Sequence, residues 1–270
     1  MRFTAFTSWS LQTYLTFKVI RRIILHFFFA ISFVLISVSG ANALDILRRS
    51  DSTSLVTLYN NAGGAGWINK SGWLSSYITS WYGVTTSSIN GSVRVTGITL
   101  PNNNLTGTLV INTLTELQVL DVRSNPLPGG SSDYSQNLKL KWIDASNTGM
   151  GMPSGIGNLT LLESLNLSDN NITQVGGGGS AIPTGITNCT KLTYLNLYNN
   201  KFTGPIPSSI GNLVNLVTLA LGNNLLSGII PIGIGSLTKL KFLGLEYNPK
   251  VRILHLSIST AKNQKKSPKT

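Results

Sequence analysis

An asparagine recurs along this chain at near-constant spacing, and this repeat restricts the fold more than any other feature. Each copy belongs to the frame apolar-x-apolar-x-x-Asn, and a threonine, Thr148, fills the one vacant position. The asparagines are Asn103, Asn125, Asn170, Asn200, Asn224 and Asn248. The frames open at Ile98, Leu120, Ile143, Leu165, Leu195, Leu219 and Leu243, giving steps of 22, 23, 22, 30, 24 and 24 residues. A period of this length predicts stacked coils in place of a globule with one central core.

Each frame predicts a short strand followed by a turn. Apolar residues two positions apart on an extended segment point to the same side, so Leu195 and Leu197 should face inward. Their neighbours Tyr194, Asn196 and Tyr198 should then face outward. The turn that follows carries backbone N–H and C=O groups that need partners near a core. Because an asparagine amide has two donor hydrogens and an acceptor, we expect each one to bridge its own coil to the next, forming a ladder.

The residues after each ladder position carry a second pattern. The best copies read LYNNKFTGPIPSSIGNLVNL at 197–216 and LGNNLLSGIIPIGIGSLTKL at 221–240. Proline at 207 or 231 disfavours helix, so this side should be extended or loosely wound. The whole pattern resembles the plant-type extracellular leucine-rich repeat. The resemblance implies an α/β repeat fold: a right-handed solenoid with a parallel β-sheet on its concave face and an irregular or 3-10 convex side.

Four segments are expected along the chain. Residues 1–43 resemble a signal peptide, because Arg21 and Arg22 precede an apolar run that ends in a small-x-small site at Ala43. An uncleaved membrane anchor at 23–39 is the alternative. An N-terminal cap at 44–97 and about seven repeats at 98–250 follow, with a glycine loop at 176–179. Residues 251–270 should form an irregular strand, expected over Val251 to Ile258, and a basic disordered tail.

The cap is expected to begin with a helix at 50–62, which glycines at 63, 64 and 66 end. Three tryptophans, Trp67, Trp73 and Trp81, should cover the open edge of the first coil. This segment resembles the cysteine-free cap of bacterial and protist leucine-rich-repeat proteins, since threonine follows the Trp81-Tyr82-Gly83-Val84 stretch where the plant type has cysteine. The chain has one cysteine, Cys189, so no intramolecular disulfide is possible, and we expect a core thiol.

The charge distribution argues against nucleic acid as the partner. The net charge is +12, yet residues 44–249 hold 11 basic and 9 acidic residues, a net of only +2. The remaining basic residues lie in the two terminal segments. We therefore expect no nucleic-acid binding, and membrane attachment only through an uncleaved signal anchor.

The sequence also argues against an enzyme. Its two histidines are His26, in the signal segment, and His255, in the terminal segment, so neither a metal site nor a cofactor is expected. Asp121 and Asp144 lie on adjacent predicted strands, about 4.8 Å apart, and resemble a glycosidase carboxylate pair. No enclosing pocket is expected, however, and Arg123 and Lys141 lie alongside to pair them. The sequence predicts no catalytic residues.

Outward residues of the predicted strands form the candidate ligand-binding face. Aromatic residues and arginine carry much of the binding energy in protein interfaces. The candidates are Asp121, Arg123, Trp142, Asp144, Tyr194, Asn196, Tyr198, Phe242 and Glu246, with Asn166 and Tyr247 nearby. They predict a secreted or cell-surface recognition module for a protein, peptide or cell-wall glycan. A structural or adhesive surface protein and a truncated ectodomain of the receptor-kinase type are the alternatives. Some of these residues could instead merely shield the sheet.

Seven N-x-S/T sequons are candidate N-glycosylation sites if the chain passes through a eukaryotic secretory pathway. They lie at Asn69, Asn90, Asn104, Asn158, Asn166, Asn171 and Asn188. Repeats rich in N-L-T and N-L-S generate sequons automatically, so their number is weak evidence. A glycan on Asn166 would obstruct the concave face.

Overall fold

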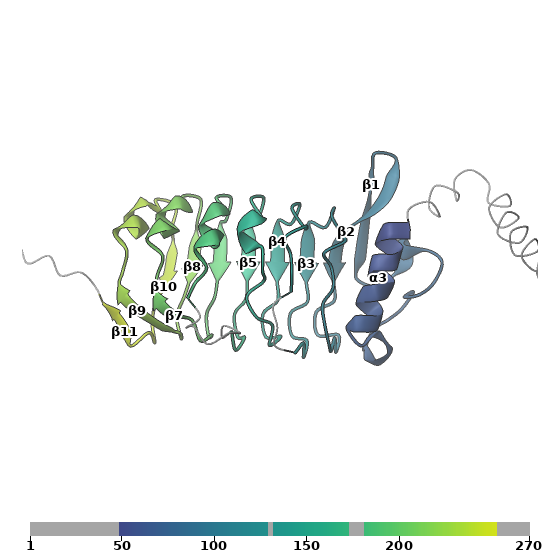
Figure 1. Ribbon diagram of the computed structural model, residues 1–270, viewed down its shortest axis with the longest axis horizontal. Coiled ribbons are helices and arrows are strands. Elements are labelled where there is room, and N and C mark those ends of the chain that lie inside the picture. Colours follow the sequence, from purple (N-terminus) through teal and green to yellow (C-terminus); the bar gives the residue numbers. More distant parts are fainter. Residues whose placement is uncertain (1–48, 129–131, 173–180, 253–270) are drawn as a thin grey trace, which may run out of the picture. The chain divides into compact units, whose positions relative to one another are not determined.

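The computed structural model describes residues 49–128, 132–172 and 181–252. The described residues of Ser50–Ile89 and those from Arg94 onward form one compact unit, which contains the repeats (Figure 1). The predicted signal peptide, the glycine loop at 176–179, His255 and the basic tail lie outside the described residues.

The repeats form a stack of coils in which each coil contributes one strand to an eight-stranded sheet, and the remaining strand, β1, comes from the cap (Figure 1). The strands follow the order β1-β2-β3-β4-β5-β6-β8-β10, and the pairs from β2 onward are parallel. They are β1 (Val84–Ile89), β2 (Ser92–Thr99), β3 (Val119–Asp121), β4 (Trp142–Asp144), β5 (Ser164–Asn166), β6 (Tyr194–Asn196), β8 (Thr218–Ala220) and β10 (Phe242–Gly244).

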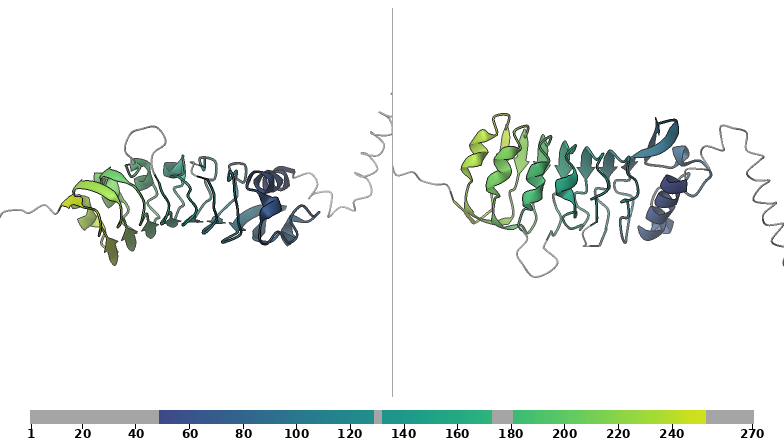
Figure 2. Two further views of the ribbon diagram at one scale, coloured as in Figure 1. Left: turned by 90° about the horizontal axis from the view of Figure 1, so that it is seen from below. Right: turned by 45° about the horizontal axis from the view of Figure 1, so that its top comes forward.

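The opposite side of the stack is mainly loops and short 3-10 helices, as predicted. The helices are η3 (Ile156–Asn158), η4 (Thr184–Asn188), η5 (Ser208–Asn212) and η6 (Ile232–Ser236). A second, parallel sheet has the order β11-β9-β7, formed by β7 (Thr203–Pro205), β9 (Leu225–Ile229) and β11 (Lys250–Arg252). Figure 2 shows the 3-10 helices and this small sheet in two further views.

The predicted register of the repeats is confirmed residue by residue. Ile98 pairs with Leu120, and each later frame-opening residue pairs with its equivalent in the next coil, as far as Leu243. These side chains belong to one continuous apolar core, except that Leu243, in the last strand, is 38% exposed. The chain therefore has the predicted α/β solenoid fold.

The asparagines form a hydrogen-bonded ladder that reaches back to the preceding coil. Asn125 is typical: its Oδ1 accepts the N–H of Leu105 at 2.9 Å, and its Nδ2 donates to Leu100 O at 2.8 Å. The same Nδ2 donates to Val122 O in its own turn at 2.7 Å. Asn170, Asn200, Asn224 and Asn248 make equivalent bonds. The ladder is as predicted, although the sequence argument placed the bridge toward the following coil.

Thr148 interrupts this ladder. Its hydroxyl donates to Ala145 O in its own coil at 2.9 Å and lies 3.0 Å from Asn170 Oδ1 in the next. Within the described ranges no hydrogen bond from its side chain reaches the preceding coil, because a threonine has no second donor group for it. The coils of Asn125 and Thr148 are therefore joined without a ladder bond. Strand pairing and apolar packing hold them together, with the Arg123–Asp144 ion pair and an isolated β-bridge between Asp133 and Ser154.

The residue before each ladder position adopts a left-handed backbone conformation. Its φ lies between 47° and 57° at Asn102, Ser124, Asn147, Asp169, Asn199, Asn223 and Tyr247. Asparagine and aspartate tolerate this region better than other non-glycine residues, which explains their use in five of the seven coils. Tyr247 is a bulky residue in a conformation that such residues rarely adopt.

The N-terminal cap closes the first coil with a helix and an aromatic cluster. Helix α3 (Arg49–Asn61) lies one residue from its predicted position and is followed by Gly63 at φ 72° and by η1 (Gly64–Gly66). A further 3-10 turn is η2 (Ile78–Ser80). The Trp67 and Trp73 rings lie 4.7 Å apart between centroids, and Trp73 and Trp81 lie 4.8 Å apart. All three are buried in the continuous core, as predicted.

The cap also meets the ladder. The backbone N–H and C=O of Asn69 bond to the Asn103 side chain at 2.6 and 2.9 Å, so the first ladder amide is satisfied by the cap. A bidentate ion pair from Arg94 to Asp51, with Nε 2.9 Å from Oδ2, fixes the start of α3 to β2.

Candidate ligand-binding face

All nine predicted binding residues lie on the outward side of the eight-stranded sheet or in the turns that follow its strands, hereafter the outward face. The parallel register stacks equivalent residues of successive coils in rows. One row contains Trp142, Ser164, Tyr194, Thr218 and Phe242. The next contains Asp121, Asp144, Asn166, Asn196, Ala220 and Gly244. Arg123, Tyr198, Gly222 and Glu246 follow the second inward residue of their coils.

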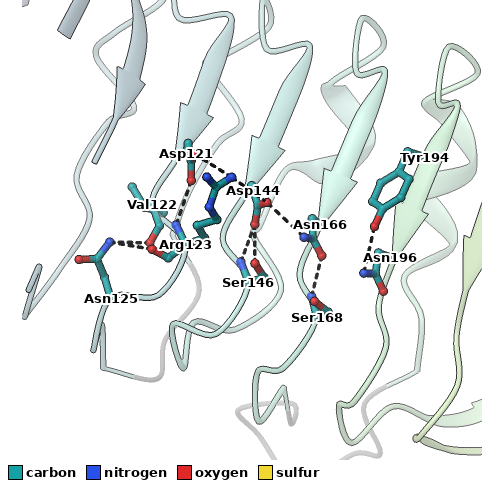
Figure 3. Close-up of polar contacts among 10 residues, drawn as sticks. All are labelled: Asp121, Val122, Arg123, Asn125, Asp144, Ser146, Asn166, Ser168, Tyr194 and Asn196. Atoms are coloured by element: carbon teal, nitrogen blue, oxygen red, sulfur yellow. Dashed lines mark hydrogen bonds and ion pairs between the residues drawn. The ribbon is translucent and has the colours of Figure 1, made fainter. Parts of the chain in front are cut away.

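The coils of β3 to β5 carry a polar network on this face (Figure 3). Arg123 Nη1 lies 3.2 Å from Asp121 Oδ2 and 3.8 Å from Asp144 Oδ2. Asn166 Nδ2 donates to Asp144 Oδ2 at 3.2 Å, and Ser146 Oγ donates to Asp144 Oδ1 at 2.6 Å. The predicted pairing of both aspartates with Arg123 is confirmed. No ion pair involves Lys141 within the described part of the chain.

The same aspartates and asparagines close the turn at the end of each strand. Asp121 and Asp144 accept the backbone N–H two residues later, at 3.2 and 3.0 Å. Asn166 and Asn196 do the same, at 3.2 and 3.0 Å. Such bonds stabilise turns locally. Asp121 is only 4% exposed and Asp144 only 7%, so most of their hydrogen-bonding capacity is used within the protein.

Charge in this network is compensated. Burial raises the pKa of Asp121, and the Asp144 carboxylate acts in the same direction, while the N–H and guanidinium of Arg123 act to lower it. Arg123 thus balances part of the negative charge of both carboxylates. Among the described residues, no three histidine, cysteine or acidic side chains are grouped so that they could hold a metal ion.

The coils of β6, β8 and β10 are different. Large side chains lie on the first and third of these coils: Tyr194, Asn196 and Tyr198 around β6, and Phe242 and Glu246 around β10. The middle coil presents only Thr218, Ala220 and Gly222. Asn196 Nδ2 donates to Tyr194 Oη at 3.2 Å (Figure 3).

The Glu246 carboxylate depends on a glycine neighbour. A Cβ at position 222 would collide with Glu246 Oε1, so this carboxylate lies directly against bare backbone. A Cβ built on Gly244 would lie 3.1 Å from both Glu246 Oε2 and Phe242 Cε1, so the ring and the carboxylate flank Gly244. Sequence reasoning singled out the large residues and missed the small outward residues of the β8 coil, Thr218, Ala220 and Gly222. The signal for them was the lack of any large outward side chain in that coil.

Two aromatic residues at this end are widely exposed. Phe242 is 51% exposed and Tyr247, with its left-handed backbone, is 75% exposed. Tyr194 and Tyr198 are half-buried, and so is Trp142 in the polar part of the face.

The sequons differ in how free their side chains are. Asn90, Asn158, Asn171 and Asn188 are exposed. Asn104 is exposed but donates to Gly66 O at 2.9 Å, and Asn69 Oδ1 accepts the Ser71 N–H at 3.0 Å. Asn166 is engaged with Asp144 and Ser168, so a glycan there would disturb the network. Glycosylation at all seven stays a prediction.

Cys189 is a core thiol, as predicted. Its Sγ is fully buried and donates to Ile156 O at 3.2 Å. Burial raises the pKa of the Cys189 thiol to about 11, so the reactive thiolate is scarce at neutral pH.

Family models for leucine-rich repeats match two adjacent stretches of the chain, residues 161–189 and residues 190–249. No curated protein matches the sequence. Within the described residues no helix is both long and apolar enough to cross a bilayer.

Several solved structures resemble the chain. The PEPR1–AtPEP1 complex is 27% identical with a TM-score of 0.63, covering 76% of this chain and 28% of that one. The ectodomain of the Arabidopsis receptor kinase HAESA, in complex with an IDA peptide hormone, is 26% identical with a TM-score of 0.62, covering 74% and 33%. Pollen Receptor Kinase 3 is 25% identical with a TM-score of 0.60, covering 71% and 93%. The chain has the leucine-rich-repeat solenoid fold, and it spans a third or less of the length of the PEPR1 and HAESA chains.

Proposed function

We propose that this chain is an extracellular or cell-surface recognition module that binds a peptide or protein segment on the outward face of β6, β8 and β10. The observation that carries the proposal is that the coils of β6 and β10 carry large outward side chains, whereas the β8 coil between them carries only small ones. Tyr194 and Tyr198 lie on one side, and Phe242 and Glu246 on the other.

Exposed aromatic surface supports this location. Phe242 leaves half of its surface in water, and aromatic groups are the usual anchors of protein interfaces. Tyr247 occupies a backbone conformation that six other coils fill with asparagine, aspartate or serine. A bulky residue there costs conformational free energy, and such strain is found preferentially at functional sites.

The polar part of the face is less suited to a ligand. Binding there would have to compete with the bonds that Asp121, Arg123 and Asp144 make to one another. Glu246 takes part in no ion pair among the described residues, so its carboxylate favours a ligand with a basic group beside an apolar one.

The comparisons support a peptide as the ligand class. The HAESA structure is a complex with a peptide hormone, and it shares the fold over 74% of this chain. Within the same proposal, the chain is of the plant type with a cysteine-free cap, its signal segment is cleaved after Ala43, and it has no catalytic activity. A truncated receptor-kinase-type ectodomain and glycan binding are the alternatives that fit the same surface.

Selection of a phage-displayed random peptide library against the purified chain tests this proposal. Peptides selected on the wild type should lose binding to a Tyr194→Ala, Phe242→Ala double variant by about 100-fold, because two central anchors are removed. Trp142→Ala is the matched control, since it removes a half-buried aromatic residue from the same row in the β4 coil.

Thermal unfolding of both variants must stay close to that of the wild type for the comparison to hold. Loss of binding in the Trp142→Ala control alone would place the ligand on the polar part. Retention of binding in both variants would exclude the outward face.

A structural or adhesive role is the second candidate, and one observation favours it. Ile229 and Ile232, at the last complete coil, are 49% and 89% exposed, which is apolar surface that self-association would bury. Light scattering over a concentration series tests it: growth of oligomers that Ile232→Ser abolishes would support adhesion, and a monomer at all concentrations would exclude it.

A further inference from the structure

The edge of the sheet at which the strands begin carries a regular row of residues, separate from the outward face. In each coil the residue two positions before the first inward residue donates its N–H to the equivalent carbonyl of the preceding coil. Lys141 to Gln118, Glu163 to Lys141, Thr193 to Glu163, Val217 to Thr193 and Lys241 to Val217 make these bonds at 2.7–2.9 Å. This continuous bonding stacks the residues in line, about 4.8 Å apart.

Lysines recur on this edge in every second coil. Lys141 and Lys241 belong to the row itself, and Lys139, Lys191 and Lys239 lie two residues earlier in their coils. These five residues, all exposed, are the lysine edge. They precede β4, β6 and β10, whereas the coils of β5 and β8 carry Leu161 with Glu163, and Asn215 with Val217. The strand arrows point away from this edge in Figure 1.

No ion pair between described residues neutralises the positive charge on this edge. The ion pairs of the described residues involve Arg94 and Arg123, and none involves the lysine edge. Lys239 Nζ donates to the neutral Asn215 Oδ1 at 2.7 Å. From β4 to β10 the edge has five lysines and one glutamate, so its net charge is +4. Residues 44–249 as a whole have a net charge of only +2. The rest of the body is therefore slightly acidic, and the edge is a distinct cationic strip.

We propose that the lysine edge binds a linear acidic polysaccharide lying along the stack, with its acidic groups on alternate sugars. Lysines two coils apart are separated by about 10 Å, twice the strand spacing. One sugar of an extended chain spans about as far as one strand spacing, so a carboxylate on every second sugar matches the lysines. Glu163, between Lys141 and Lys191, would repel a carboxylate on the intervening sugar, while Thr193 and Asn215 offer hydrogen bonds to hydroxyl groups.

Other polyanions fit this edge less well. Single-stranded nucleic acid binds through aromatic side chains on which bases stack, and the two lysine-bearing positions contain no aromatic residue from β3 to β10. A bilayer surface presents headgroups over an area, whereas this strip is one or two side chains wide. A linear polymer with sparse charge uses such a strip along its full length.

Titration of the full chain with a hyaluronan oligosaccharide, in which glucuronate alternates with a neutral sugar, tests the proposal. The triple variant Lys139→Gln, Lys191→Gln, Lys239→Gln should bind on the order of 10-fold more weakly, with a shallower salt dependence, because ionic contacts are lost. The triple variant Lys70→Gln, Lys201→Gln, Lys250→Gln removes the same charge elsewhere and should bind like the wild type. Glu163→Gln should improve binding of polygalacturonate, which has an acid on every sugar.

Three outcomes would overturn the proposal. No hyaluronan binding at low salt would show that the edge is not a site. Equal weakening in both triple variants would show an effect of net charge alone. Tighter binding of a DNA duplex or of phosphatidylserine vesicles than of hyaluronan would point to another class of partner. The Tyr194→Ala, Phe242→Ala variant should keep hyaluronan binding, so this test is independent of peptide recognition.

Discussion

The two ends of the coil stack differ in the residues that cover them. At the N-terminal end the first coil is covered by α3 and by Trp67, Trp73 and Trp81, none of which belongs to the repeat. At the other end, β10 is the last strand of this sheet among the described residues, and its coil presents repeat residues to solvent. Leu219 is fully buried in β8, and its equivalent Leu243 in β10 is 38% exposed. A repeat residue is thus buried by the coil that follows it, as well as by its own.

This difference shows that closing a repeat array requires side chains outside the repeat. The cap supplies large rings for the apolar end and the Asn69 backbone for the Asn103 amide. The final described coil has the ladder amide of Asn248 without such a cover, so we expect stability to fall from the N-terminal end toward β10.

The largest effect is expected at the cap. Trp67→Ala should lower the free energy of unfolding by about 3–5 kcal/mol, because it removes a buried ring that packs against Tyr59 and Trp73 and an Nε1 hydrogen bond to Ala62 O at 2.8 Å. Urea denaturation measures it. Trp142→Ala is the control: it removes a half-buried side chain and should lower the free energy of unfolding by well under half as much. Equal losses would contradict the special role of the cap.

We expect the asparagine ladder to stabilise the junctions between coils unequally. Asn125→Ala should cost about 2–4 kcal/mol, because it leaves the buried Leu105 N–H and Leu100 C=O without their partner. Thr148→Ala, which removes no bond to the preceding coil, should cost about 1 kcal/mol. Native-state hydrogen exchange should show coils after Thr148 opening at lower free energy than those before it. Uniform protection along the stack would refute this.

A matched pair of leucines tests the open end. Leu243→Ala should cost about 1 kcal/mol, since the side chain is partly in water already, whereas Leu219→Ala in the neighbouring coil should cost about 2–5 kcal/mol. Both are read from urea denaturation midpoints at constant m. A cost at Leu243 equal to that at Leu219 would mean that another element covers β10.

The smallest effect on stability is expected at Asp121, which lies in the interior of the stack because its strand β3 pairs with β2 and with β4. Because its pKa is raised from 3.8 on folding, the folded state binds this proton more tightly than the unfolded state. The stability gained is present at low pH and is lost as the pH rises through the folded pKa. Relative to Asp121→Asn, the wild type should lose stability as the pH rises from below the ordinary carboxyl pKa into the neutral range, as measured by urea denaturation. A change of opposite sign would mean that Arg123 outweighs burial.

Much of the fold followed from the sequence because the repeat period specifies it. Two apolar residues and an asparagine recur in each coil, so the frame from Ile98 to Leu243 predicted the strand register without error. The helix before Gly63 and the burial of the three tryptophans also followed, since caps and glycines are local signals. The boundaries assigned to the signal peptide and tail stay predictions.

The candidate face was harder to predict because its character depends on contacts between coils. Asp121 and Asp144 point outward as expected, yet Arg123 and their own turns enclose them, which a single frame does not reveal. The place of Glu246 over Gly222 likewise requires two coils side by side. The left-handed conformation before each ladder position could have been predicted, because asparagine or aspartate occupies that position in five of the seven coils. The asparagine that follows in the ladder drew attention away from it.

The gap at Thr148 has a mechanical consequence. Under a pull along the stack, adjacent coils share the load through strand bonds and, elsewhere, through an asparagine amide in parallel with them. At the junction between the Asn125 and Thr148 coils that second tether is missing. The Asp133–Ser154 bridge and the Arg123–Asp144 ion pair also cross this junction, but they involve water-exposed side chains. We therefore expect rupture to begin here, so that the coils from β4 to β10 separate from the capped segment as a block.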